Sequence, residues 1–545
     1  MDAITHPPAP LNEPVLGYAP GSVERVEIEA ALQELSAAPA ELTMTVGGVR
    51  RMGGGAAIDV VAPHRHALVL GRAAQATEAD VEAAVGSALA AAPAWRELPF
   101  DERAAVFLRA ADLLTGPWRA RLNAATMLGQ SKTVQQAEID AACELADFLR
   151  FNVAFARELL EQQPTSSRGV WNRMEYRPLE GFVLAITPFN FTAIAGNLPA
   201  APALLGNVVV WKPSPTQQLA AHHTMALFEA AGLPAGVINM VTGDGAAVST
   251  VAVPHPSLAG IHFTGSTPTF QHLWRAVGTS IDSYATYPRL VGETGGKDFV
   301  VAHPSADPAG LVTGLVRGAF EYQGQKCSAA SRAYVPRSLW DGGVRDALAA
   351  TTESLTYGDV TDFANFGAAV IDRRAFDRLS AALDRLHSAN SVSVLAGGKA
   401  DDSEGFFVRP TVAECTDPTD ELFTREYFGP LLGVHVYDDS TPNGWHDALV
   451  QLESVSPYAL TGAVFARDRA AVDEASNLLR FAAGNFYVND KPTGAVVGQQ
   501  PFGGARASGT NDKAGSPWNL MRWLSPRAIK ETFVSPTAHE YPHMG

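Results

Sequence analysis

The sequence predicts an α/β protein built around two open, largely parallel sheets. Short apolar runs alternate with helical stretches along the middle of the chain, which indicates buried parallel strands joined by βαβ crossovers. The same rhythm restarts after about residue 310, which indicates a second α/β domain. With 545 residues, the chain is long enough for roughly two to four domains of about 100–200 residues each.

The first third of the chain predicts an arm, a helical region and an exposed strand. Residues 1–40 are rich in Pro and Ala and predict a loosely held arm that ends in a short helix. Residues 77–163 predict helices, because Ala, Leu and Glu dominate there, and Thr77 with Asp80 marks a helix start. Residues 168–180 alternate apolar with polar side chains, which predicts an exposed strand or hairpin arm.

The buried strands are predicted at short apolar runs that are bounded by turns. These runs span residues 182–186, 208–211, 237–241, 261–263, 299–301, 333–335, 432–436 and 461–465. After Met521 the chain becomes extended again.

Composition excludes several classes of function. A net charge of −16 argues against nucleic-acid binding, which needs a basic surface. Cys143, Cys327 and Cys415 are too few and too scattered for a disulfide framework or a zinc site, so we expect no metal and a reducing, cytoplasmic location. Residues 1–14 fit neither a signal peptide nor a transit peptide. Residues 181–211 carry no charge, but three prolines interrupt them, which predicts a buried α/β segment and not a membrane span.

Two motifs follow predicted strands at the edge where open α/β sheets bind ligands. In FTGSTP, residues 263–268, Thr267 is the predicted helix N-cap and Pro268 the first helical residue, and the free N–H groups there suit a phosphate. Such a turn is also common as a purely structural feature. Lys212 closes another strand, where it is either a ligand contact or a solvated lysine.

Two further motifs carry reactive side chains. The segment GQKCS, residues 324–328, predicts a helix start that places Cys327 beside Lys326, a setting that lowers a thiol pKa. The alternative for this cysteine is a buried filler, which is our interpretation of Cys143 and Cys415. Glu293, next to a pair of glycines, either caps a turn or acts as a general base.

Taken together, these motifs resemble the aldehyde dehydrogenase superfamily over residues 46–533. Six landmarks stand in the order of that family: ITPFNF (186–191), WKPS (211–214), FTGS (263–266), ETGGK (293–297), GQKCS (324–328) and EYFGP (426–430). Finer features resemble the branch of L-glutamate γ-semialdehyde (1-pyrroline-5-carboxylate) dehydrogenases. The most specific of them is GQQPFGGARASGTNDKAG at residues 498–515.

This resemblance implies two Rossmann-like open-sheet domains, one cofactor-binding and one catalytic, plus a small β oligomerisation flap. The NAD-binding domain with its N-terminal arm would take residues 1–167 and 181–292, and the catalytic domain residues 293–520. The flap would take residues 168–180 and 521–545, so a homodimer or a higher homo-oligomer is expected.

The implied activity is the NAD-dependent oxidation of L-glutamate γ-semialdehyde, which is in equilibrium with 1-pyrroline-5-carboxylate, to L-glutamate. This is the second step of proline catabolism, and it implies a functional link to a separate proline dehydrogenase. By resemblance, Cys327 is the nucleophile that forms a thiohemiacetal and then a thioester. The Asn190 amide and the Cys327 N–H would stabilise the oxyanion, and Glu293 would activate the water that hydrolyses the thioester.

The resemblance also assigns the cofactor contacts. Lys212 would bind the adenosine ribose, Ser266 the pyrophosphate and Glu426 the nicotinamide ribose, with Phe428 beside the ring. Pro215 stands where many NAD-preferring relatives carry a glutamate, so NADP stays open as a second cofactor. The remaining candidates for cofactor binding are Ile186, Pro188, Ser214 and Gly265.

The substrate would be a small zwitterion. Ser328, Gly494 and Ala495 match the positions that bind its α-carboxylate in the branch, and Phe502 would border its aliphatic chain, with Phe191 as a second candidate.

Three alternatives remain at this point. Glu144 is either a carboxylate paired in the core or a group of the pocket. The chain could instead be another NAD(P)-dependent semialdehyde dehydrogenase, including a CoA-acylating type, although Glu293 argues against acyl transfer to CoA. It could also be a structural or binding protein that keeps the fold without the chemistry, which the presence of Cys327, Glu293 and Asn190 argues against.

Overall fold

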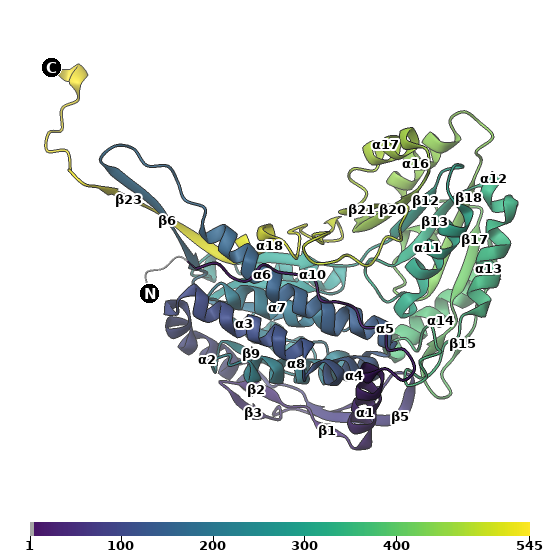
Figure 1. Cartoon of the computed structure of the whole chain (residues 1–545), viewed down its shortest axis with the longest axis horizontal. Coiled ribbons are helices and arrows are strands. Elements are labelled where there is room, and N and C mark those ends of the chain that lie inside the picture. Colours follow the sequence, from purple (N-terminus) through teal and green to yellow (C-terminus); the bar gives the residue numbers. More distant parts are fainter. Residues whose placement is uncertain (1–4) are drawn as a thin grey trace.

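The computed structural model describes residues 5–545 and contains two seven-stranded sheets (Figure 1). In the first sheet, five parallel strands carry an antiparallel edge formed by β2 and β3. Its strands, in spatial order, are β11 (Arg289–Glu293), β10 (Leu258–Thr264), β7 (Phe182–Ile186), β8 (Val208–Lys212), β9 (Ile238–Met240), β2 (Met44–Val46) and β3 (Val49–Arg51).

Helices pack around this first sheet and bury one large apolar core with it. The predicted helix start is confirmed: Thr77 is the N-cap of α2 and forms a reciprocal capping box with Asp80. The helices of this half are α1 (Val23–Ala37), α2 (Glu78–Glu97), α3 (Phe100–Thr115), α4 (Arg119–Gln130), α5 (Val134–Ala137), the π-helix η1 (Glu138–Glu144), α6 (Leu145–Leu160), α7 (Thr192–Leu204), η2 (Pro215–Gln217), α8 (Gln218–Ala230), α9 (Ala246–Val251), α10 (Thr267–Thr279), η3 (Ile281–Ser283) and α18 (Pro517–Met521).

The second sheet is parallel except for its antiparallel edge strand β14. Successive residues of its central strands belong to different apolar clusters: Val301 packs in one and Val300 in the other, so the sheet is covered on both faces. Its strands are β14 (Val392–Ala396), β17 (Thr411–Cys415), β18 (Leu431–Tyr437), β13 (Ala330–Pro336), β12 (Asp298–Ala302), β20 (Thr461–Phe465) and β21 (Asn485–Val488). The helices of this half are α11 (Pro308–Phe320), η4 (Glu321–Gly324), α12 (Arg337–Leu339), the π-helix η5 (Trp340–Val344), α13 (Arg345–Ser354), α14 (Arg373–Ser388), α15 (Glu421–Thr424), α16 (Gly444–Val455) and α17 (Arg469–Leu478).

A two-stranded ribbon projects from the body of the molecule (Figure 1). β6 (Val170–Pro178) pairs antiparallel with β23 (Leu524–Thr532) along its whole length. The exposed strand and the extended C-terminal segment predicted from the sequence are therefore both present. The remaining strands form short sheets: β1 (Ala40–Glu41), β4 (Ala57–Ala62) and β5 (Arg65–Ala74); β15 (Ala400–Asp401) and β16 (Phe407–Val408); and β19 (Tyr458–Ala459) and β22 (Ala505–Arg506).

The predicted α/β class with two Rossmann-like sheets is confirmed. Two local predictions are wrong. Ser266, and not Thr267, is the N-cap of α10, because its hydroxyl accepts a hydrogen bond from the N–H of Thr269 (3.3 Å). The described part of the N-terminal arm, from residue 5 on, is not loosely held, because the Glu13 carboxylate forms two ion pairs with the body of the protein. Within residues 5–545, no helix combines the length and the apolar character that crossing a membrane requires.

Candidate active site

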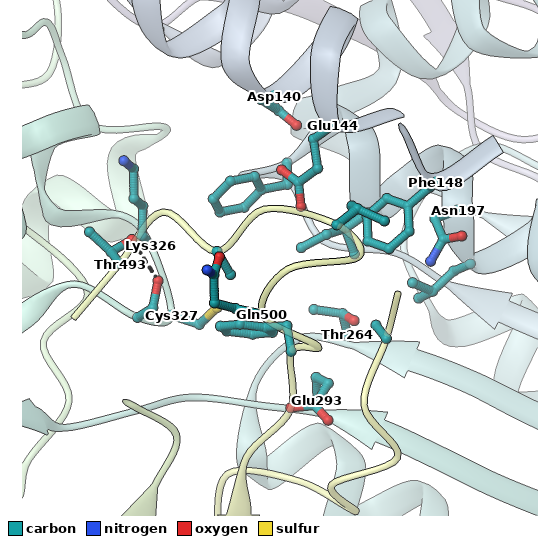
Figure 2. Close-up of a pocket in the computed structure, with 18 of the residues that line it drawn as sticks. Asp140, Glu144, Phe148, Asn197, Thr264, Glu293, Lys326, Cys327, Thr493 and Gln500 are labelled. Carbon is teal, nitrogen blue, oxygen red and sulfur yellow. Dashed lines mark hydrogen bonds between the residues drawn. The ribbon is translucent and has the colours of Figure 1, made fainter. Parts of the chain in front are cut away.

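A cavity lined from both halves of the chain brings many of the predicted residues together (Figure 2). Its wall includes the predicted nucleophile Cys327 and the predicted base Glu293. The predicted substrate contacts Ser328, Gly494, Ala495, Phe502 and Phe191 also line it. A second, smaller cavity is lined by Glu426 and Phe428, and Cys327 belongs to the walls of both. The thiol therefore stands where the two cavities adjoin.

Cys327 lies in a turn and not at a helix N-terminus. Residues 322–324 have positive φ angles of 49°, 53° and 63°, and a right-handed helix does not continue through left-handed residues. Residues 325–329 then form a turn that leads directly into β13. The predicted helix through residues 329–331 is therefore wrong, and no helix start at Cys327 lowers the pKa of its thiol.

The thiol of Cys327 is also less acidic than predicted. Burial raises the pKa of this thiol above its usual range, and the negative charges of Asp298 and Glu293 raise it further. Lys326, which was expected to lower the pKa, forms an ion pair 3.1 Å long with Glu321. At neutral pH the resting site therefore holds a thiol, and formation of the thiolate requires a base.

Glu293 ends β11 and faces the cavity. Its carboxylate accepts a hydrogen bond from the N–H of Gly504 (2.9 Å). Burial raises the pKa of Glu293 well above its usual range, although this bond and the charge of Lys513 oppose the shift. A carboxylate with a raised pKa is a stronger base than one in water, so Glu293 is suited to take a proton.

Asn190 lies close to the nucleophile in the chain fold, but it is not among the residues that line the larger cavity in the described part of the chain. Its buried side-chain amide donates a hydrogen bond to the carbonyl of Gln325 (3.0 Å), two residues before Cys327. An amide nitrogen has two hydrogens, so this bond leaves one for a second acceptor.

The predicted cofactor residues of the first sheet stand side by side at the carboxyl ends of its strands. The strand register pairs Ile186 with Lys212 and Thr264 with Glu293. Burial lowers the pKa of Lys212 to about 8, and the charge of Asp244 opposes the shift. This edge is the usual ligand-binding edge of an open α/β sheet.

The other predicted cofactor residues follow directly after these strands. Pro188 is buried two residues beyond the end of β7, and Ser214, half-buried, bonds the hydroxyl of Thr216 (3.1 Å). Gly265 and the exposed Ser266 form the turn before the 13-residue helix α10. The N–H of Thr269 donates to the Ser266 hydroxyl, whereas the N–H groups of Ser266 and Thr267 have no partner within residues 5–545. Free N–H groups at a helix N-terminus fit a phosphate of a dinucleotide.

Glu426 and Phe428 line the smaller cavity, which also reaches Cys327. Glu426 accepts a hydrogen bond from the N–H of Gly296 (2.8 Å), and burial raises the pKa of Glu426 to about 7. Phe428 has a positive φ of 56° and packs edge-on against Phe189. Lys297, whose buried Nζ has no hydrogen-bond partner within residues 5–545, also lines this cavity. Free polar groups and an aromatic face fit a sugar and a flat ring.

The sequence reasoning missed Thr493, which bonds the hydroxyl of Ser328 (2.8 Å) inside the protein. Thr493 begins the stretch Thr493–Val497 that lines the cavity, and Gly494 within it has a positive φ of 95°. No motif marks Thr493 in the sequence, because its role arises from a contact across two distant segments.

Glu144, for which two interpretations were open, lines the cavity. Figure 2 shows its carboxyl group reaching from the helical wall that faces Glu293. Burial raises the pKa of Glu144 to about 8; Asp140 raises it as well, and Lys132 opposes both. Asp140 and Lys132 form a buried ion pair (2.7 Å) with each other, so the paired core carboxylate is Asp140 and not Glu144.

Comparisons with known proteins identify close relatives over the whole chain. The probable delta-1-pyrroline-5-carboxylate dehydrogenase of Schizosaccharomyces pombe is 50% identical over 540 residues, 98% of each chain. A mitochondrial delta-1-pyrroline-5-carboxylate dehydrogenase of Bos taurus is 49% identical over 98% of this chain and 94% of its own. A crystal structure of the delta-pyrroline-5-carboxylate dehydrogenase of Mycobacterium tuberculosis, bound with NAD, is 64% identical, has a TM-score of 0.96 and covers 100% of both chains.

The cytoplasmic location expected from the sequence is contradicted by these relatives. The protein of Bos taurus is named as mitochondrial, and so are relatives from other animals, from Dictyostelium discoideum and from Emericella nidulans. A low cysteine count reports on the redox state of a compartment, so it does not distinguish the cytosol from another reducing compartment.

The model of the aldehyde dehydrogenase family matches residues 51–529. The match spans the second sheet, the five parallel strands of the first sheet, both cavities and the six motifs noted above. The chain belongs to the aldehyde dehydrogenase family.

Proposed function

We propose that this protein oxidises L-glutamate γ-semialdehyde, the open form of 1-pyrroline-5-carboxylate, to L-glutamate with NAD. The observation that carries the proposal is the content of one cavity. A thiol (Cys327) and a base (Glu293) share it with a carboxylate, Glu144, that has no hydrogen-bond partner among the described residues, and with a loop that offers free N–H groups. An α-amino acid aldehyde presents the matching groups: a carbonyl, an ammonium and a carboxylate.

The chemistry begins at sulfur. Glu293, directly or through a water, takes the proton of the Cys327 thiol, and the sulfur attacks the aldehyde carbon to form a thiohemiacetal. The second N–H of the Asn190 amide and the backbone N–H of Cys327 stabilise the charge that develops on oxygen. Bound NAD supplies the acceptor for the hydride that leaves this carbon, and a thioester remains on Cys327. Glu293 passes this first proton to solvent and then takes a proton from the water that attacks the thioester. The C–S bond breaks, L-glutamate leaves, and the Cys327 thiolate regains a proton from Glu293.

The residues for the cofactor divide into an adenosine side and a nicotinamide side. Lys212, Ser214 and Ser266, with Ile186, Pro188 and Gly265 in the same strip, would hold the adenosine ribose and the pyrophosphate. Glu426 would hold the nicotinamide ribose, with Phe428 beside the ring. Asp244, whose charge acts on Lys212, supports NAD over NADP, because a carboxylate there repels a 2′-phosphate.

The substrate contacts follow from the charges that the cavity offers. Ser328, Gly494 and Ala495 would bind the α-carboxylate, and Glu144 on the facing wall would bind the α-ammonium. Phe502 and Phe191 would border the aliphatic chain between them. That one cavity is lined by all of these groups and by Cys327 supports a substrate that carries both charges as well as an aldehyde.

The chain would be organised as two domains and a flap. Residues 1–167 and 181–292 would form the NAD-binding domain and residues 293–520 the catalytic domain. The ribbon of residues 168–180 and 521–545 carries exposed Trp171, Phe533 and Val534, which supports a role in homo-oligomer formation. The substrate would come from a separate proline dehydrogenase, since oxidation of proline yields 1-pyrroline-5-carboxylate.

The test is a panel of kcat/KM values for glutamate semialdehyde, succinate semialdehyde and butanal, each with NAD and NADP. We expect glutamate semialdehyde with NAD to exceed butanal by about 100-fold, because two charge-assisted contacts are lost in butanal. Cys327→Ala should abolish turnover with every aldehyde. Equal kcat/KM for all three aldehydes, or a requirement for CoA, would refute the proposal.

A further inference from the structure

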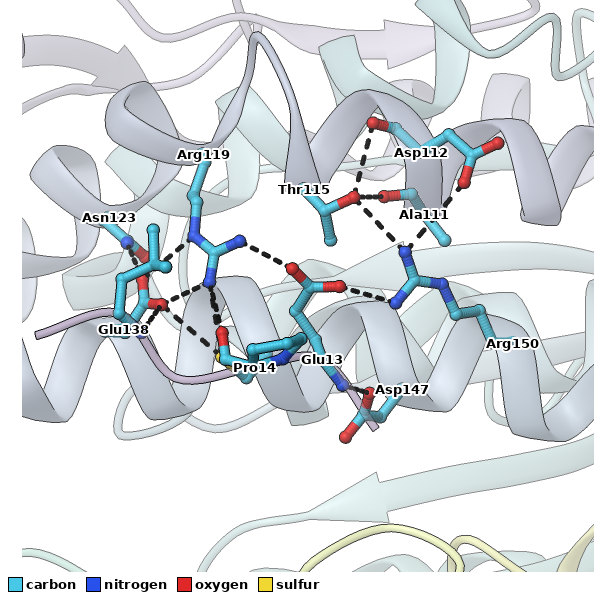
Figure 3. Close-up of polar contacts among 12 residues, drawn as sticks. Glu13, Pro14, Ala111, Asp112, Thr115, Arg119, Asn123, Glu138, Asp147 and Arg150 are labelled. Atoms are coloured by element: carbon cyan, nitrogen blue, oxygen red, sulfur yellow. Dashed lines mark hydrogen bonds and ion pairs between the residues drawn. The ribbon is translucent and has the colours of Figure 1, made fainter. Parts of the chain in front are cut away.

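Residues 12–18, called here the arm segment, run beside α4, η1 and α6 and are fixed there by ion pairs (Figure 3). One oxygen of the Glu13 carboxylate accepts from Arg119 (2.7 Å) and the other from Arg150 (2.7 Å). Since these arginines belong to α4 and α6, a single carboxylate joins the arm segment to two helices. The backbone N–H of Glu13 also donates to Asp147 of α6 (2.7 Å).

Asn12 connects this arm with the loop between β21 and β22. Its Nδ2 donates to Asp147 (2.8 Å) and to the carbonyl of Val497 (2.8 Å). Its Oδ1 accepts from the side-chain amide of Gln499 (2.9 Å). Both donor positions and the acceptor of one amide are therefore used to join α6 to this loop.

The other end of the arm segment contacts η1, the element that carries Glu144. The N–H of Leu16 (2.9 Å) and the hydroxyl of Tyr18 (2.7 Å) both donate to the carboxylate of Glu138. Glu138 is the first residue of the π-helix η1, and Glu144, which lines the cavity, is the last. The arm segment thus contacts both elements that would recognise the charged end of the substrate.

Two hydrogen bonds of the loop are local and close it on itself. The N–H of Val496 donates to the side chain of Gln500 (3.0 Å), and the N–H of Gln500 returns to the carbonyl of Val496 (3.0 Å). Val497, whose carbonyl Asn12 holds, lines the cavity and lies two residues after Ala495. A shift of this carbonyl would therefore be transmitted over a short distance to the N–H groups at residues 494–495.

From these contacts we propose that Asn12 is a positioning residue for substrate selectivity. It holds residues 494–497 in register with α6 and η1, so that the loop N–H groups and the Glu144 carboxylate engage the two charges of one substrate molecule. This inference rests on the proposed function, since it assumes an α-amino acid aldehyde. It involves no contact between Asn12 and the substrate.

The test compares Asn12→Ala with Val15→Ala, a matched change at an exposed position of the same segment (51% exposed). We expect Asn12→Ala to raise KM for glutamate semialdehyde about five- to tenfold, the effect of losing one or two hydrogen bonds. The kcat for this substrate, and kcat/KM for butanal, should stay within about twofold of wild type. Val15→Ala should change none of these constants.

A second variant tests whether the hydrogen bonds that Asn12 donates are needed, or whether any polar side chain at this position is enough. Asn12→Asp keeps the acceptor for Gln499 but loses both donors, and it places a carboxylate beside Asp147. We therefore expect it to be at least as impaired as Asn12→Ala. Equal losses with both aldehydes, or wild-type KM in both Asn12 variants, would overturn the inference.

Hydrogen–deuterium exchange separates this inference from the proposed function. In Asn12→Ala, and not in Val15→Ala, the peptide that contains residues 494–500 should exchange faster, whichever aldehyde is the substrate. If wild type fails to oxidise glutamate semialdehyde but this difference appears, the proposed function fails and the positioning role of Asn12 stands. If exchange is unchanged in Asn12→Ala, the positioning role is refuted even with the proposed substrate.

Discussion

The hydroxyl oxygens of Ser328 and Thr493 lie 2.8 Å apart inside the protein. The residue after the nucleophile is therefore bonded to the residue before Gly494, where the cavity loop turns. One hydroxyl pair links the reacting centre to the proposed carboxylate site.

From this link we predict that Ser328→Ala raises KM for glutamate semialdehyde about tenfold, because a hydrogen bond to a charged group is lost. KM for butanal should change less than about twofold. Thr493→Val, which keeps the shape but removes the partner hydroxyl, should show a smaller effect of the same kind. Steady-state kinetics with both aldehydes measure this, and equal effects on the two would remove Ser328 from carboxylate recognition.

Alkylation should reveal the raised pKa of Cys327. We expect the rate with iodoacetamide in the absence of cofactor to rise about tenfold per pH unit between pH 7 and 9, because the thiolate is the reactive form. Cys143 and Cys415 are buried and should react more slowly, and mass spectrometry of the labelled peptides distinguishes the three. Cys327→Ala is the control. A rate that levels off below pH 8 would show a depressed pKa in place of a raised one.

Glu293→Gln should slow both steps in which Glu293 takes a proton, namely formation of the Cys327 thiolate and hydrolysis of the thioester. Gln keeps an oxygen for the N–H of Gly504 but has no basic carboxylate, so hydrolysis of the thioester should slow by about 10²–10⁴-fold. If acylation stays faster than hydrolysis, rapid mixing will show a burst of NADH near one equivalent per active site. A steady-state rate equal to that of wild type would exclude Glu293 as the base.

The pKa of Glu144, raised by burial to about 8, gives a pH-dependent prediction. Below this value the carboxyl is mainly neutral and attracts an ammonium weakly, so the inhibition constant of L-glutamate should fall about tenfold as pH rises from 6.5 to 8.5. L-glutamate is the better probe here, because it does not cyclise as the semialdehyde does. In Glu144→Gln the inhibition constant of L-glutamate should be larger and should not change with pH. If the constant of the variant depends on pH as in wild type, a group other than Glu144 causes the dependence.

The same substitution predicts a change in stability. A carboxyl whose pKa is raised in the folded state favours folding at low pH, and this contribution is lost as pH rises through about 8. Glu144→Gln should therefore raise the thermal midpoint relative to wild type at pH 9 by about 2 °C or more, and by less at pH 5. Calorimetry at the two pH values measures these thermal midpoints, and a cooperative transition also shows that the variant is folded.

Regular elements of this fold could be predicted because their signals are local. The residues of β20 were predicted at both boundaries, and the helix start at Thr77 was identified from two side chains three positions apart. The motif residues Cys327 and Glu293 could likewise be placed in one site, because each follows a pattern that the family shares.

What could not be predicted depends on contacts between distant segments. The turn before Cys327 requires glycine at position 324, because a Cβ there would lie 2.3 Å from the carbonyl oxygen of Gly429. No local pattern in the sequence reveals this neighbour. The π-helix that ends at Glu144 is only seven residues long and continues into α6, so it is too short for the periodicity of the sequence to distinguish it from an α-helix. The attachment of Asn12 and Glu13 depends on partners far along the chain.

The ribbon of β6 and β23 has a consequence for the order of folding. Val170 is paired with Thr532, so during synthesis β6 leaves the ribosome long before its partner exists. Until then β6 presents an unpaired edge, which is a template for association with other chains. The pairing also closes a loop around most of the polypeptide, and long-range closures of this kind form slowly. The ribbon should therefore be among the last parts of the molecule to acquire native structure, and the period before it closes is when the nascent chain is most exposed to aggregation.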